Sequence, residues 1–186
     1  DALVAGLYDG AFRAAVVQSA GDLGLGCGDA LDGELVLVDG VLRVCRGDGV
    51  VAAVASDALL PFAEVAVFEP TFTRELGPLT GKQFETLIEA LVPSDNLFYA
   101  IRVDAAFDSM TVREAVRQQR PYRGLAEAVK DQHEASVADT EGTMIGFKGP
   151  DVFQGLSVAD FHLHYLDSAA QFGGHRTDPS GQFRPV

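Results

Sequence analysis

The chain has 186 residues, of which 47% are hydrophobic and 22% charged, and its formal net charge at pH 7 is −13. This composition excludes a disordered chain and a miniature protein built on disulfides, because a chain of this length buries enough apolar surface to fold by itself. The acidic balance argues against nucleic acid or an anionic membrane as the main partner, since both require a positively charged surface. A local basic pocket for one small anion is still allowed.

Cysteine usage and the absence of long apolar runs indicate the compartment. Cys27 and Cys45 are too few to form a disulfide framework, which favours a reducing environment. No apolar run reaches the roughly 20 residues that a bilayer span requires. Residues 1–20 lack the basic start and long apolar block of a signal peptide. We therefore expect a cytoplasmic protein with no membrane partner.

The first half of the chain predicts one helix and several short strands. Helical spacing of apolar residues predicts a helix over Ala11–Ala20, and a glycine-dense loop is expected at Gly21–Gly28. Two apolar runs flank Asp39-Gly40, a strong two-residue turn signal, so Glu34–Cys45 is expected to be a β-hairpin. Further strands are expected at Val50–Val54 and Val65–Phe68.

The second half predicts one clear helix among strands. Thr80 and Gln83 form a capping-box pattern at the start of a helix over Thr80–Val92, which Pro93 ends. A short helix is expected at Leu125–Gln132, and strands at Leu97–Val103, Met110–Val116, Thr143–Phe147 and Val158–Leu166.

Few long helices are expected, and they do not alternate strictly with strands. This pattern predicts an α/β protein of the α+β type, with mixed, largely antiparallel β-sheets and a few flanking helices. We expect one compact unit over residues 1–186. Two subdomains are allowed, at about residues 1–123 and, carrying the histidines, about 124–186.

Three of the four histidines fall within fourteen residues of one another. Side chains alternate across a strand, so His162 and His164 should project from one face. Ten residues separate His164 from His175, which is enough for a turn and a return strand, and two glycines before His175 allow close backbone approach. Three imidazoles could then hold one cation and leave coordination positions open, as in catalytic zinc sites.

These histidines allow other interpretations. Two histidines on one strand face are often only polar surface. A cupin barrel would place a Glu a few residues after the second histidine, and none lies between His164 and His175. The fourth histidine, His133, lies in a polar, helix-like stretch and is expected to be plain surface.

Two charged residues are candidates for the remaining chemistry. Glu34 begins an apolar strand and could act as a general acid or base. The ordinary alternative is a carboxylate at the edge of a strand with no catalytic role. Arg113 lies in an apolar strand and could hold a carboxylate with two parallel hydrogen bonds, although an exposed, acid-paired arginine is the ordinary alternative. The glycine-rich segment lacks Gly-Lys-Ser/Thr, which argues against a phosphate loop.

Motifs spread in order over most of the chain carry a resemblance to a known family. The His-x-His and Gly-Gly-His segments after Glu-Gly-Thr and Gly-Phe are the most specific of them. Together these motifs resemble the alpha-acetolactate decarboxylase family. They are Leu7-Tyr8-Asp9-Gly10, Gly21–Gly26, Leu31–Leu35 with Asp39-Gly40, Pro61-Phe62-Ala63, Asn96–Ile101, Val112-Arg113, Gln119, Pro121-Tyr122, Glu141–Phe147, Phe161–Tyr165 and Gly173–His175.

The resemblance implies a zinc enzyme that converts 2-acetolactate to acetoin and carbon dioxide, and that commonly forms a homodimer. His162, His164 and His175 resemble the zinc ligands, Glu34 the acid beside the metal, and Arg113 the active-site arginine. The implied metal chelates the hydroxyl and ketone oxygens of the substrate and stabilises an enediolate. Arg113 would then orient the carboxylate, and Glu34 would supply the final proton.

Departures from the family pattern keep alternatives open. Cys27 replaces a threonine in a segment that lines the substrate pocket in relatives, so we expect Cys27 in that pocket. Relatives also have a longer tail that supplies another carboxylate, whereas Asp178 is the only acid among the 11 residues after His175. A non-catalytic metal- or ligand-binding relative, or a zinc hydrolase, would fit these features too. Imidazole ligands also suit copper, iron and nickel.

Overall fold

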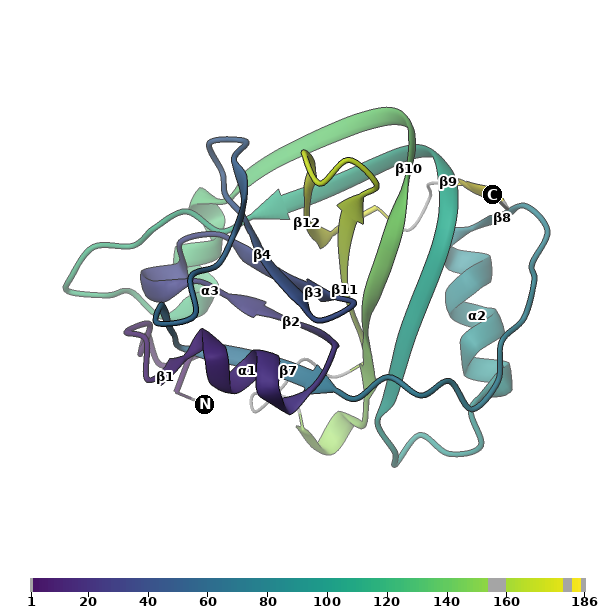
Figure 1. The fold of residues 1–186 in the computed structure, drawn as a ribbon, viewed down its shortest axis with the longest axis horizontal. Coiled ribbons are helices and arrows are strands. Elements are labelled where there is room, and N and C mark those ends of the chain that lie inside the picture. The colour runs from purple at the N-terminus through teal and green to yellow at the C-terminus, as the bar shows by residue number, and fades with distance from the viewer. Residues whose placement is uncertain (1, 154–159, 179–181, 185–186) are drawn as a thin grey trace.

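The computed structural model describes residues 2–153, 160–178 and 182–184. Two main sheets lie face to face, one of five strands and one of six. Helix α1 (Ala14–Ala20) packs on the outer side of the five-stranded sheet, and α2 (Gly81–Leu91) packs on the outer side of the six-stranded sheet (Figure 1). All strand pairs among the described residues are antiparallel, which confirms the predicted α+β class.

The five-stranded sheet contains the predicted hairpin. Asp39 and Gly40 both have positive φ, at 51° and 75°, which is the backbone of a type I′ turn and suits the twist of the two strands it joins. The order across this sheet is β5 (Val51–Ala53), β4 (Val41–Cys45), β3 (Glu34–Val38), β2 (Leu23–Cys27) and β7 (Phe62–Ala66).

The prediction of a loop at Gly21–Gly28 is wrong, because most of this segment is strand β2, between β3 and β7. A Cβ added at Gly26 would lie 2.3 Å from the carbonyl oxygen of Phe62, so the neighbouring backbone leaves no room for a side chain. The glycines of this segment therefore allow a close backbone approach rather than a flexible turn. The predicted Val65–Phe68 strand starts earlier, as β7.

The six-stranded sheet is built on two long strands, β9 (Tyr99–Glu114) and β10 (His133–Gly149), which pair along their length. Strands β11 (Asp160–Asp167) and β12 (Gly173–Arg176) connect the outer edge of β10 back to β9, so these four strands close on themselves. Strand β13 (Gln182–Arg184) pairs with β9 and with β8 (Leu79–Thr80).

Several predicted boundaries in this half are wrong. The two strands predicted at Leu97–Val103 and Met110–Val116 are one strand, β9. The strand predicted at Thr143–Phe147 is the end of β10, which starts at His133 and so replaces the helix-like stretch expected there. The strand predicted at Val158–Leu166 is β11, and its first two predicted residues lie outside the described residues.

The helices follow the local signals closely. Thr80 caps α2 by accepting from the backbone N–H of Gln83, whose side chain accepts from the N–H of Thr80 in return, as predicted. The first predicted helix is shorter, with Phe12–Arg13 pairing as β1 with β6 (Leu59–Leu60). The remaining short elements are α3 (Leu125–Ala128) and 3₁₀ turns at Asp29–Leu31, Val129–Asp131 and Asp151–Phe153.

Both faces of each sheet contribute side chains to a buried core, because strand side chains alternate. Leu35 and Leu37 of β3 pack with α1, whereas Val36 points the other way and packs against Ile145 of the six-stranded sheet. The residues that face each other between the sheets are therefore mainly apolar. Among the polar residues between the sheets, Glu34 and Glu64 face the histidines of β11.

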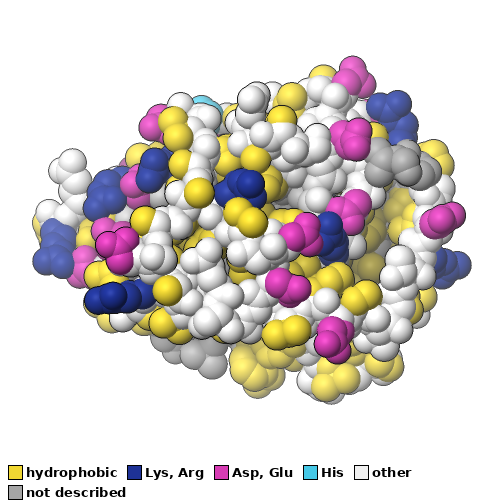
Figure 2. All heavy atoms as spheres, in the orientation of Figure 1, with side chains coloured by type: hydrophobic (Ala, Val, Ile, Leu, Met, Phe, Trp, Pro, Cys, Tyr) yellow, Lys and Arg dark blue, Asp and Glu magenta, His cyan; other side chains and the backbone are white. Residues whose placement is uncertain are grey.

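The visible face of the molecule carries charges of both signs. On the face shown in Figure 2, lysine and arginine side chains are interspersed with acidic ones. Within the described ranges, no helix has the length and apolar character needed to cross a membrane.

Candidate metal centre

Strand alternation places two histidines between the sheets. His162 and His164 of β11 are buried on the side that faces the five-stranded sheet, whereas Leu163 and Tyr165 point into the core beneath α2. After a turn, the chain returns as β12, on which His175 pairs directly with His164. The predicted turn, return strand and shared face are confirmed.

Gly174 allows β12 to fit between its neighbours. Its φ is +153°, and a Cβ at this position would lie 2.8 Å from the carbonyl oxygen of Arg113 on β9. A side chain here would push β12 away from β9 and move His175 with it. The glycine before His175 is therefore required by close packing, as the sequence indicates.

The three imidazoles converge. The ligand atoms of His162, His164 and His175 lie within 4.8 Å of one another. The Nε2 atoms of His162 and His164 are 3.2 Å apart. Two ligands of a tetrahedral zinc ion with Zn–N bonds of about 2.0–2.1 Å would be separated by about 3.3–3.4 Å, so this spacing fits one shared ion.

The protonation of His164 also fits a ligand. Its Nδ1 donates to the carbonyl oxygen of Leu35 at 2.8 Å, so the lone pair is on Nε2, the atom that faces His162. Burial, with a smaller contribution from neighbouring His162, holds the pKa of His164 well below its usual value. Burial and His164 have the same effect on the pKa of His175. Both rings are therefore neutral near pH 7, as metal ligands must be.

Arg113 lies at the edge of this cluster. It is the register partner of His175 in the β12–β9 pair, and its Nη2 is 3.2 Å from Nε2 of His175. Because arginine has only donors, this ring nitrogen presents a lone pair. Nη1 of Arg113 donates to Oε1 of Gln132 at 3.2 Å, which holds the guanidinium in place.

Glu34 faces the cluster from the other sheet. Its Oε2 lies 3.7 Å from Nε2 of His164, and its side chain is 14% exposed. Burial raises the pKa of Glu34 to about 7, while Arg113 and the backbone N–H of Ala115 act in the opposite direction. A carboxyl group with this pKa exchanges a proton readily near neutral pH.

Comparison with known proteins agrees with this arrangement. The family model described as alpha-acetolactate decarboxylase matches residues 1–182. The chain belongs to the alpha-acetolactate decarboxylase family. It is 42% identical over 178 residues to the alpha-acetolactate decarboxylase of Methylococcus capsulatus (strain Bath), with 95% of this chain and 68% of the relative covered. The enzyme of that name from Bacillus subtilis (strain 168) is 37% identical, with 95% and 69% covered.

The fold comparison leads to the same family. The crystal structure of alpha-acetolactate decarboxylase from Bacillus subtilis strain 168 superposes with a TM-score of 0.92 at 35% identity, and covers 98% of this chain and 80% of that chain. The chain is thus a member of an enzyme family whose named relatives are carboxy-lyases.

Cys27 and His133 lie in different surroundings. Cys27 of β2 is buried beside Tyr8 and Leu31, and pairs in register with Glu34. Its contact with substrate remains a prediction. His133 is exposed and its Nδ1 lies 3.0 Å from Oε2 of Glu114, so it is a surface residue, as expected, and it does not belong to the group of three convergent imidazoles.

Sequence reasoning missed two residues of the site. Gln132, which binds Arg113, lies in a segment that was expected to be helical. Glu64 lies on β7, and its Oε2 is 3.4 Å from Nδ1 of His162. The alternation of Phe62, Glu64 and Ala66 on one face of β7 was the available signal, because it places a carboxylate among inward-facing apolar residues.

Proposed function

We propose that this protein is a zinc-dependent enzyme that decarboxylates 2-acetolactate to acetoin and carbon dioxide. The observation that carries the proposal is the convergence of three imidazoles from β11 and β12 beside Arg113 and Glu34. Membership of the alpha-acetolactate decarboxylase family supports the substrate and the reaction class.

His162, His164 and His175 would hold the ion. The ligand set is all imidazole, which zinc binds well, and three protein ligands leave coordination free for a substrate. When bound, zinc would supply a Lewis acid at the hydroxyl and ketone oxygens of the substrate and so stabilise the enediolate charge that develops as carbon dioxide leaves.

Arg113 would bind the substrate carboxylate. Gln132 holds the guanidinium at the rim of the cluster, and the planar arrangement of the arginine donors matches a carboxylate. The interaction is strongest with the anionic substrate and is lost when neutral carbon dioxide forms. We therefore assign Arg113 to substrate binding and orientation.

Glu34 would deliver the proton that completes the reaction. The bond between the carboxylate carbon and C2 breaks, its electron pair remains on the C2–C3 unit, and C2 then takes up one proton to give acetoin. The overall reaction consumes one proton for each carbon dioxide released. A buried carboxyl group with a pKa of about 7, facing the cluster, can carry that proton.

Cys27, next to Glu34 in the β2–β3 pair, is proposed to border the substrate pocket. The homodimer remains a prediction from the resemblance, and the cytoplasmic location remains a prediction from the two thiols.

Reconstitution of metal-depleted protein with zinc tests the proposal. Wild type should bind one zinc ion per chain and form acetoin, and His164→Ala should lose both. His133→Ala, which alters the exposed histidine, should retain both and serves as the matched control. Zinc binding without acetoin formation would instead favour a non-catalytic relative. Retention of metal and activity by His164→Ala would contradict the proposed site.

A further inference from the structure

A carboxylate from the opposite sheet faces the outer nitrogen of one proposed ligand. Glu64 extends from β7 of the five-stranded sheet, and its side chain is 16% exposed. Its Oε2 lies 3.4 Å from Nδ1 of His162, whose side chain is 9% exposed. Nδ1 of His162 has no acceptor at hydrogen-bonding geometry among the described residues, so Glu64 is the charged group placed to receive its proton.

The other histidine of β11 shows what this contact does. On His164 the outer nitrogen, Nδ1, donates to the carbonyl of Leu35, and the inner nitrogen, Nε2, keeps the lone pair. His162 is arranged in the same way, with Nε2 facing inwards at 3.2 Å from Nε2 of His164 and Nδ1 facing a carboxylate. A carboxylate accepts protons and repels lone pairs, so it requires the N–H of a neutral imidazole on its own side.

The consequence is that two lone pairs point at each other between His162 and His164. At a separation of 3.2 Å this arrangement is unfavourable unless a cation lies between them. Glu64 and the Leu35 carbonyl thus impose, from two strands of one sheet, the tautomers that a metal ion requires of ligands carried by the other sheet.

We infer that Glu64 is the positioning residue of His162: it accepts the Nδ1–H, selects the tautomer with the lone pair on Nε2, and makes that lone pair more basic towards the metal. Removing a carboxylate that accepts the second N–H of a metal-bound histidine typically lowers metal affinity by about 10–100-fold. The inference rests on the proposed function and adds Glu64 to the proposed metal centre.

Zinc affinity, measured by competition with a chromophoric chelator at one fixed pH, tests the role of Glu64. Glu64→Gln keeps the shape but removes the charge, and should weaken zinc binding by about 10-fold or more. Glu69→Gln removes an exposed carboxylate just beyond β7 and should have no effect. Cobalt-substituted Glu64→Gln should also show a changed visible absorption spectrum, because the basicity or orientation of one ligand changes.

The tautomer of His162 can be measured in the wild-type protein, without any substitution. Long-range ¹H–¹⁵N spectra of zinc-loaded wild type should show the His162 proton on Nδ1, and a proton on Nε2 would overturn the inference. Unchanged zinc affinity and an unchanged cobalt spectrum in Glu64→Gln would also overturn it, while leaving the proposed function intact. If wild type binds no zinc, the proposed function fails together with the inference.

Discussion

His164 and His175 lie directly opposite each other in the antiparallel pair β11–β12, with their ring centroids 5.3 Å apart. Arg113 is the partner of His175 on the next strand, so the three residues form one row across the sheet. On the facing sheet, Cys27 and Glu34 are likewise register partners. The histidines, Arg113 and Glu34 therefore project from paired strands of two facing sheets, and backbone hydrogen bonds fix the positions from which they project.

Arg113→Lys should lower kcat/KM for acetolactate by about 100-fold. Lysine keeps the positive charge but lacks the two parallel N–H donors with which a guanidinium binds a carboxylate. Loss of two charge-assisted hydrogen bonds, at about 1.5 kcal/mol each, corresponds to a decrease of about 100-fold. Most of the effect should appear in KM, because the residue binds the substrate carboxylate before the bond breaks. Steady-state acetoin formation measures this, and kinetics indistinguishable from wild type would remove Arg113 from substrate binding.

Glu34→Gln should lower kcat by about 100-fold or more, because glutamine cannot transfer a proton. Zinc content should remain that of wild type, since Glu34 is not among the three imidazole ligands. Turnover measured alongside metal analysis separates the two effects. A loss of zinc that accounts for the whole loss of activity would show that Glu34 holds the metal and does not supply the proton.

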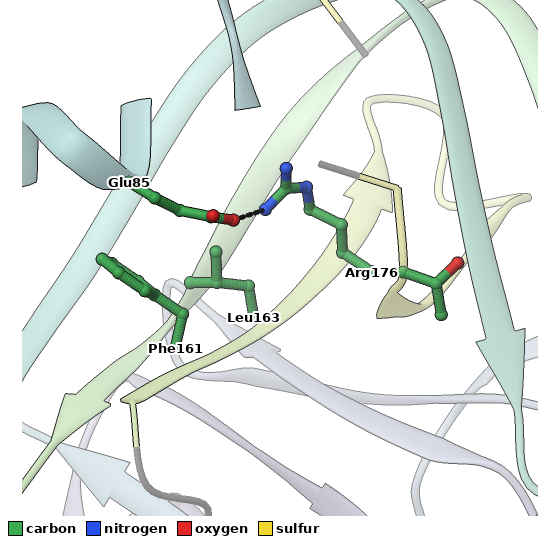
Figure 3. Close-up of a pocket in the computed structure, with 5 residues that line it drawn as sticks. Glu85, Phe161, Leu163 and Arg176 are labelled. Carbon is green, nitrogen blue, oxygen red and sulfur yellow. Dashed lines mark hydrogen bonds and ion pairs between the residues drawn. The ribbon is translucent and has the colours of Figure 1, made fainter. Parts of the chain in front are cut away.

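Glu85→Gln should destabilise the protein, because Glu85 of α2 pairs with Arg176 of β12 at 3.1 Å (Figure 3). The Arg176 side chain is only 5% exposed, and its Nε and Nη2 have no other acceptor among the described residues. Breaking such a pair costs up to about 3 kcal/mol when one partner is partly exposed. Urea unfolding measures the loss, and Glu89→Gln, on the exposed side of the same helix, is the control. Equal midpoints for the two variants would contradict the prediction.

The two thiols should make the protein sensitive to alkali. Burial, and then the charge of Glu114, raise the pKa of Cys45 to about 12, and burial raises the pKa of Cys27 in the same direction. The unfolded chain releases these protons above about pH 9, so each thiol lowers the free energy of unfolding by up to about 1.4 kcal/mol per pH unit between its unfolded and folded pKa values.

Urea unfolding at a series of pH values checks this. Below about pH 8 both thiols contribute their full stability, and the loss begins as pH rises. Replacing both with alanine should flatten the alkaline decline. In addition, iodoacetamide at about pH 8 should modify neither thiol of the folded protein. Rapid labelling of Cys27 under those conditions would contradict its burial.

Local signals predicted the elements whose stability is local. The Asp39-Gly40 hairpin and the capping box of Thr80 and Gln83 depend on residues within a few positions of each other, and both were found. Strand β2 was missed because its glycines suggest a turn, and only the approach of β7 shows why side chains are excluded there. Strand β10 was foreseen only at its apolar end, because its first half is largely exposed and polar.

The residues of the site also differ in whether a local sequence pattern predicts their position. His162, His164 and His175 could be grouped from sequence because strand alternation and a short return bring them together. Glu34 and Arg113 are chemically suitable residues in the sequence, but their places depend on long-range pairing. Arg113 is brought beside His175 by the pairing of β12 with β9, and Glu34 is brought beside His164 by the way the two sheets face each other. Glu64 is 98 positions before His162 in the chain, and no local pattern links the two residues.

The central claim is that three imidazoles hold one divalent ion and leave it open to a two-oxygen substrate. Diffraction data from crystals of the zinc-loaded protein, collected on both sides of the zinc absorption edge, test it directly. One anomalous peak is expected within about 2.0–2.1 Å of a ring nitrogen of each of His162, His164 and His175. No peak at that position, or an ion that one of the three rings does not reach, would contradict it.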